Sequence, residues 1–76
     1  MEEIPVRQLA GWSGRTLAEL ELRTRLGVSV LAIVREGERI EAPDPNRPLG
    51  EQDRVVLGGT RTRLAAVRQG VVAPQG

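Results

Sequence analysis

Residues 28–41 read Val-Ser-Val-Leu-Ala-Ile-Val-Arg-Glu-Gly-Glu-Arg-Ile-Glu. Positions 28–34 are dense in β-branched residues and apolar toward both sides, which is typical of a central strand covered on each face. The Glu-Gly-Glu at 36–38 predicts a tight hairpin turn, and residues 39–41 predict a short return strand. A chain of 76 residues has a thin core. Its own helices would therefore cover one face of the strand, and a second copy could cover the other.

The segment before the hairpin predicts an edge strand and one helix. Residues 3–6 are extended, and the proline within them has no N–H to donate, so this strand lies at an edge or starts at the proline. Thr16 followed by Glu19 is a capping-box pattern that begins a helix. We expect this helix to be short and broken near Leu22, and to end at Gly27.

The segment after the hairpin predicts a loop, a strand and a second helix. Residues 43–48 hold three prolines and exclude regular structure. Residues 54–57 predict a strand, and Thr60 caps a helix that runs to about Gln69. The order is strand, helix, strand, strand, strand, helix, which predicts an α+β domain with a mixed or antiparallel sheet. We expect one domain over residues 1–76, with a core at about 4–69 and a flexible tail at 70–76.

Missing residue types argue against an enzyme and against a metal site. The chain has no Cys and no His, so it lacks a thiolate nucleophile, the commonest general base and the commonest metal ligands. Ser13 has no base after it that could activate it. We therefore predict no catalytic residues, no resident metal and no cofactor.

Charge and hydropathy bear on partners. The net charge is +1 with both signs interspersed, and Trp12 is the only aromatic residue, so base stacking and a basic stripe are both missing. From this we expect no nucleic-acid partner. The apolar run at 28–34 is far too short to span a bilayer, and Glu2 and Glu3 stand where a signal peptide would be basic. We expect a cytoplasmic domain without direct membrane insertion.

The stretches GRTLAEL at 14–20, LGV at 26–28, VLAIVREG at 30–37 and DRVVLG at 53–58, together with the proline-rich loop, resemble the TrkA-C domain. That domain is the C-terminal half of the regulator of potassium conductance, RCK. The resemblance implies a homodimer that senses a small regulator and controls a potassium channel, a potassium uptake system or a cation/proton antiporter. The transport subunit would be a partner in cis or in trans at the inner face of the membrane. Cyclic di-AMP, held across the dimer interface, is the regulatory ligand that it suggests.

The hairpin is the candidate ligand site. Alternation along the strand puts Val28, Val30, Ala32 and Val34 on one face, and Ser29, Leu31, Ile33 and Arg35 on the other. Apolar side chains would take a flat purine, and an arginine would stack on it or meet a phosphate. The predicted ligand-binding residues are Val30, Ala32, Arg35, Arg39, Ile40 and Pro43. The alternative is a structural dimerisation domain, with a filled interface, a solvated hairpin and no small ligand.

Other candidate sites have plainer explanations that we favour. Gly27 and the glycines at 14, 58 and 59 mark the ends of elements rather than a phosphate loop. Asp53 is expected to bond its own turn rather than a metal. The carboxylates at 36, 38, 41 and 44 are interleaved with arginines, which favours solvated charge over a cation site. Trp12 is expected to cover the edge of the core, although an exposed anchor for a partner is the alternative.

Overall fold

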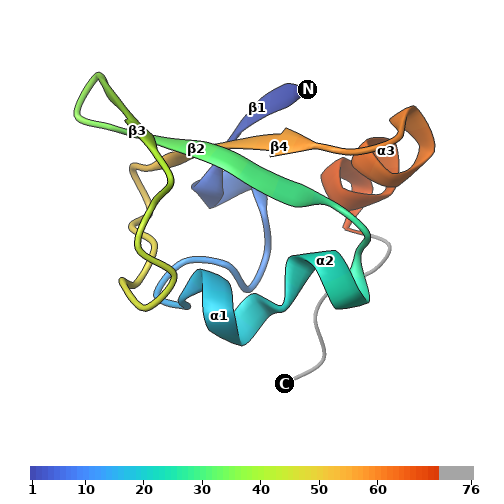
Figure 1. Ribbon diagram of the computed structural model, residues 1–76, viewed down its shortest axis with the longest axis horizontal. Coiled ribbons are helices and arrows are strands. Elements are labelled where there is room, and N and C mark those ends of the chain that lie inside the picture. Colours follow the sequence, from blue (N-terminus) through green and yellow to red (C-terminus); the bar gives the residue numbers. More distant parts are fainter. Residues whose placement is uncertain (71–76) are drawn as a thin grey trace.

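Four strands form one antiparallel sheet in the order β1-β4-β2-β3 (Figure 1). A computed structural model describes residues 1–70, so the expected tail lies largely outside the described residues. The strands are β1 (Glu2–Pro5), β2 (Ser29–Arg35), β3 (Glu38–Glu41) and β4 (Arg54–Gly58). The expected α+β class and element order are confirmed. Of the two expected sheet types, the antiparallel one is formed, with the proline-containing strand at one edge.

The helices lie on one side of the sheet. They are α1 (Leu17–Leu20), α2 (Leu22–Arg25) and α3 (Arg61–Gln69), and a 3-10 turn, Val6–Gln8, follows β1. In Figure 1, α1 and α2 run beneath β2, and α3 closes the end of the layer opposite the hairpin. The hairpin therefore extends away from the helices, and its side chains there are left without helical cover.

The first helix is broken as expected. The Glu19 N–H donates to Thr16 Oγ1 at 3.1 Å, and the Thr16 N–H donates to Glu19 Oε1 at 2.9 Å, which is a complete capping box. Glu21 has a left-handed φ of +48°, which ends α1 and starts α2. The break falls one residue before the expected Leu22, because Glu21 takes the turn conformation and Leu22 is already helical.

A β-bulge corrects the predicted face assignment of β2. Val30 pairs with Leu57 and Ala32 pairs with Val56, so Leu31 is an extra residue on β2. Val30 therefore faces the helices, as Ile33 does, whereas Ala32 faces away from them. The prediction that Val30 and Ala32 share one face was wrong, because one inserted residue reverses the parity of the rest of the strand.

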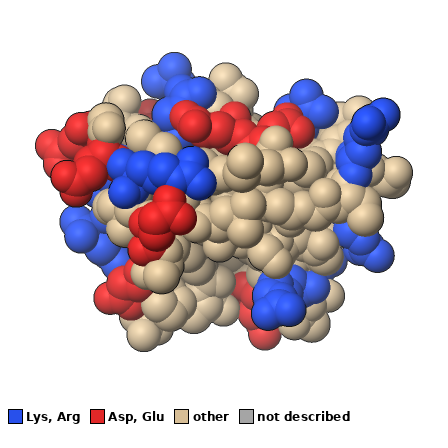
Figure 2. Space-filling model, turned by 45° about the horizontal axis from the view of Figure 1, so that its top comes forward, with Lys and Arg blue, Asp and Glu red and all other residues tan. Residues whose placement is uncertain are grey.

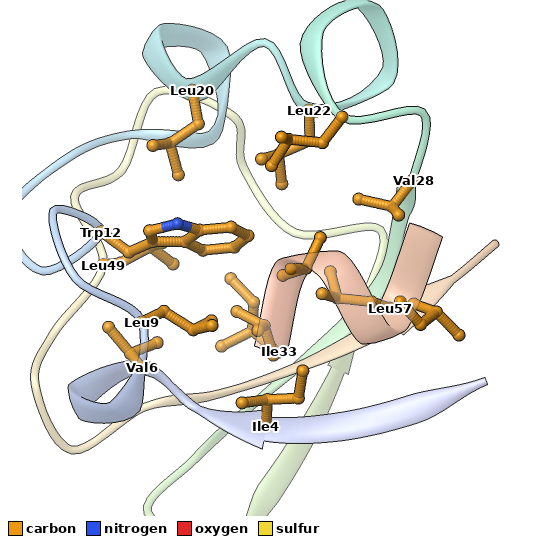
Figure 3. Packing of buried hydrophobic residues seen from close by; sticks show 14 residues of the cluster. Ile4, Val6, Leu9, Trp12, Leu20, Leu22, Val28, Ile33, Leu49 and Leu57 are labelled. Carbon is orange, nitrogen blue, oxygen red and sulfur yellow. The ribbon is translucent and has the colours of Figure 1, made fainter. Parts of the chain in front are cut away.

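Buried apolar side chains fill the space between the sheet and the helices (Figure 3). Trp12 is 3% exposed, and its indole lies close to Leu49, Leu9 and Leu20. The expectation that Trp12 covers the core edge, rather than anchoring a partner, agrees with this burial. Because Trp12 is the only aromatic residue, its fluorescence reports on the core alone.

The second face of the sheet carries no helix among residues 1–70 (Figure 1). We call it the outer face; its apolar residues are Leu31, Ala32, Val34 and Val56. Leu31 is 40% exposed and lies over Gly58, where an added Cβ would come within 3.2 Å of the Leu31 Cδ1. Figure 2 shows uncharged surface across this region with charged side chains around it. Ala32 and Val56 are buried by neighbouring side chains, so Leu31 and the half-buried Val34 supply the exposed apolar area, which suits a contact with another protein.

Candidate ligand site at the hairpin

A hollow of about 120 Å³ lies where the β2–β3 hairpin meets the proline loop. We call it the hairpin hollow; its lining residues are Ile33, Arg35, Ile40, Pro43, Asp44 and Arg47. Ile33 and Ile40 are direct partners across the two strands, so their side chains share one face. Ala42, at a φ of +49°, turns the chain after β3 and brings Pro43 back beside them. Three apolar side chains thus form walls that a flat ligand can contact.

Arg35 is fixed by Asp53. The Arg35 Nε donates to Asp53 Oδ1 at 3.0 Å, and Nη2 donates to Oδ2 at 2.5 Å. The same carboxylate accepts the Gly50 N–H at 2.8 Å, which agrees with the expected turn role of Asp53. Hydrogen bonds from Arg35 hold the pKa of Asp53 below its ordinary value, although burial of the carboxylate opposes this. The hydrogen bond to Asp53 raises the pKa of Arg35 from its ordinary value.

Charges at the hollow balance. The hollow is lined by two cations, Arg35 and Arg47, and by one anion, Asp44. Asp53, which is hydrogen-bonded to Arg35, supplies a second negative charge. Because Asp53 takes the Nε and Nη2 edge of Arg35, the Nη1 edge is left without a hydrogen bond among residues 1–70. A neutral site of this kind favours stacking and a few directed hydrogen bonds over attraction of a polyanion.

The structure brings three of the six predicted residues together and separates the others. Arg35, Ile40 and Pro43 line the hairpin hollow. Val30 packs against the core, and Ala32 is fully buried on the outer face. Arg39 forms an ion pair with Glu41. Both side chains lie on the outer face, because Arg39 is the cross-strand partner of Val34, which faces that side.

Sequence reasoning missed three lining residues, Ile33, Asp44 and Arg47. Strict alternation placed Ile33 on the same face as Arg35, but the prediction took its apolar strand residues, Val30 and Ala32, from the other face. Asp44 and Arg47 lie in the proline loop, whose path the sequence pattern does not specify. Asp44 Oδ1 accepts the Asn46 N–H at 2.9 Å, a local turn bond that could have suggested that this loop folds on itself.

No three acidic side chains among residues 1–70 converge as metal ligands. No helix of the same described segment is long and apolar enough to cross a membrane.

Comparisons with known proteins agree on one family. A family model, the TrkA-C domain, matches residues 1–69. The RCK_C domain dimer of S. agalactiae BusR in complex with c-di-AMP is 25% identical, with a TM-score of 0.78 and coverage of 91% of each chain. The RCK C domain of the potassium transport protein KtrA, in complex with cyclic diadenosine monophosphate, is also 25% identical, with a TM-score of 0.81; the match covers 90% of this chain and 78% of that one.

A channel also contains a similar domain. The GsuK channel bound to NAD is 28% identical, with a TM-score of 0.70, and the match covers 92% of this chain but 12% of the channel chain. A search of curated protein sequences found no match. These structures confirm the expected fold, and cyclic di-AMP is the ligand present in the BusR and KtrA complexes.

The prediction that excluded nucleic acid as a partner was wrong. S. agalactiae BusR has been solved in complex with its busA-promotor DNA, with 25% identity and a TM-score of 0.76 to this chain. The match covers 93% of this chain and 35% of the BusR chain. Charge and aromatic content describe only the domain in which they are counted. They therefore cannot exclude nucleic acid as a partner of proteins that carry such a domain.

Proposed function

Because this chain belongs to the TrkA-C domain family, we propose that it is a cytoplasmic regulatory domain that senses a small ligand and controls cation transport. The observation that supports this most is the hairpin hollow, where Arg35 is held in place beside three apolar walls. The transport system would be a potassium channel, a potassium uptake system or a cation/proton antiporter. Similarity to KtrA, a potassium transport protein, supports this choice.

The ligand that we propose is cyclic di-AMP. Its two adenines are flat and apolar on their faces, which suits Ile33, Ile40 and Pro43, and the Nη1 edge of Arg35, which Asp53 leaves without a hydrogen bond, suits a base or a phosphate. The hollow holds about 120 Å³, well below the ~300 Å³ at which small-molecule pockets begin. A cyclic dinucleotide therefore needs a second copy of the chain to enclose it, and its two-fold symmetry matches a two-fold dimer.

The outer face is the surface where we propose that the second copy packs. Leu31 supplies exposed apolar area there, and the ion pairs Glu3–Arg54 and Arg39–Glu41 form a charged rim. The hairpin hollow lies on the helix side of β3, which is an edge strand of the sheet, so we propose that the ligand extends around this edge to reach the partner copy. In this arrangement Arg35, Ile40 and Pro43 contact the ligand, Arg39 faces the partner copy, and Val30 and the buried Ala32 support the strand.

Two other functions are compatible with the fold. A structural dimerisation domain would use the same outer face and bind nothing small. A regulator with a DNA-binding output is favoured by the similarity to the BusR domain dimer. We propose no catalytic activity in either case. The surrounding genomic sequence distinguishes control of transport from control of a promoter. A transport gene beside this one would indicate the first, and a DNA-binding segment encoded together with this domain would indicate the second.

Calorimetric titration with cyclic di-AMP tests the proposed function. The chain should release or absorb heat, and Ile40→Ala, which leaves the Arg35–Asp53 pair intact, should weaken binding about five- to tenfold by removing apolar contact. Arg39→Ala tests whether the ligand reaches the outer face. Arg7→Ala, on the 3-10 turn after β1, is the matched control and should bind as the unaltered chain does. No heat with the unaltered chain would favour the structural alternative.

A further inference from the structure

A second, larger groove lies between α2 and α3, at the end of the sheet opposite the hairpin. Its volume is about 530 Å³. Its floor is apolar, from Leu26, Ala66 and Val67, and its rim carries Arg25, Arg63 and Thr60. We propose that this α2–α3 groove binds a phosphate monoester that carries an apolar or planar body. The proposal is independent of the hairpin site.

Arg63 is the residue on which the proposal depends. Its guanidinium lies across Gly27, so closely that a Cβ at Gly27 would come within 2.4 Å of Nη1 and 2.8 Å of Cζ. Among residues 1–70, the Arg63 side chain forms no ion pair and no hydrogen bond. The absence of a side chain at Gly27 thus gives room for a cation that meets no carboxylate of the described chain.

The surroundings of the groove are positive. The residues that line the groove come from segments 22–35 and 54–70. Neither segment contains an Asp or a Glu. The nearest acidic groups in sequence are engaged, since Glu21 accepts from Arg25 at 2.9 Å and Glu2 from Arg68 at 2.8 Å. In Figure 2, acidic side chains crowd the hairpin end on the left, whereas basic side chains stand without acidic ones at the right-hand end, where α3 lies in Figure 1.

The chemistry of the lining selects the ligand class. A phosphate monoester carries a charge between about −1.5 and −2 near neutral pH and accepts several hydrogen bonds, which suits a guanidinium and the Thr60 hydroxyl. The volume lies within the ~300–1,000 Å³ of small-molecule sites, so the groove has room for more than an inorganic anion. The apolar floor supplies a surface for the body of the ligand. This lining contrasts with the hairpin hollow, which is smaller and balanced in charge.

Chemical-shift titration of the 15N-labelled 76-residue chain with phenyl phosphate tests the proposal, with phenol as the uncharged counterpart. Shifts should gather at Gly27 and at residues 60–63, and phenol should produce much weaker ones. Arg63→Gln should raise the dissociation constant about tenfold or more. Arg61→Gln, on the same helix but outside the groove lining, should change it less than about twofold. Arg63→Lys, which keeps the charge and should keep the fold, should fall between the two.

Three results would overturn the proposal. Equal weakening by Arg61→Gln and Arg63→Gln would indicate diffuse attraction to the basic end, and equal binding of phenol would remove the role of the phosphate. Binding to phosphatidylglycerol vesicles, without shifts at Gly27 on addition of phenyl phosphate, would assign the groove to a lipid headgroup instead of a soluble ligand. Because cyclic di-AMP is absent from all these experiments, their outcome is separate from that of the hairpin titration.

Discussion

Replacing Asp53 with Asn removes the charge that fixes Arg35 without changing the shape of the side chain. The two side chains are 6% and 17% exposed, and two hydrogen bonds at 3.0 and 2.5 Å join them. Removing one partner of a fully buried ion pair lowers the free energy of unfolding by about 3–5 kcal/mol, because the remaining charge is left buried without a partner. Arg35 keeps some contact with water, and an amide oxygen can still accept one hydrogen bond. We therefore expect Asp53→Asn to lower the free energy of unfolding by about 2 kcal/mol.

The effect should depend on pH with a defined sign. The pKa of Asp53 is lowered in the folded chain, chiefly by its hydrogen bonds from Arg35. The carboxylate therefore contributes stability that is complete above its unfolded pKa of about 3.9 and is lost as the pH falls through the lower folded value. The difference between the unaltered chain and Asp53→Asn should be full at pH 7 and should shrink below about pH 4.

Urea unfolding followed by Trp12 fluorescence measures this directly, since the buried indole becomes exposed on unfolding. Glu3→Gln is the matched control, because it breaks an exposed pair with Arg54 and should cost less than about 1 kcal/mol. A loss below about 0.5 kcal/mol for Asp53→Asn at pH 7, or a loss that persists unchanged at pH 3, would refute the assignment of a stabilising partly buried pair.

Three further predictions follow from single positions. Ala42→Gly should raise the urea midpoint, with a gain of about 0.5–1 kcal/mol, because Ala42 holds a left-handed φ of +49°; an unchanged or lower midpoint would contradict this. Thr16→Ala should cost about 1 kcal/mol in the same assay by removing the capping box, whereas Thr24→Ala, within α2, should cost less; equal losses would argue against the cap. Leu31→Lys should shift sedimentation from dimer to monomer while the fluorescence of the folded chain stays unchanged; a persistent dimer would exclude the outer face as the interface.

Local patterns predicted the local structure well. The Thr16 and Glu19 pair gave the start of α1, because a capping box needs only residues three apart in sequence. The apolar run at 28–34 gave the central strand, because its β-branched residues fit a covered sheet whatever their partners are.

Features that depend on pairing between distant segments were not predictable in the same way. The bulge at Leu31 exists only in the register between β2 and β4, and it reverses which side chains face the core. The bond between Arg35 and Asp53 joins residues 18 apart, which meet because β2 and β4 are neighbours in the sheet. The hollow therefore lies at the hairpin where the sequence placed its candidate residues, but half of its lining was not foreseen. The α2–α3 groove was missed altogether, since it forms from segments that no motif connects.

We propose that two copies of this chain enclose one regulatory ligand at the hairpin edge of their interface. The stoichiometry of cyclic di-AMP binding, measured by calorimetry at a chain concentration well above the dissociation constant, tests it most directly. We expect one ligand for every two chains, because one hollow of about 120 Å³ is too small alone. One ligand for each chain, or no binding heat at several temperatures, would contradict it.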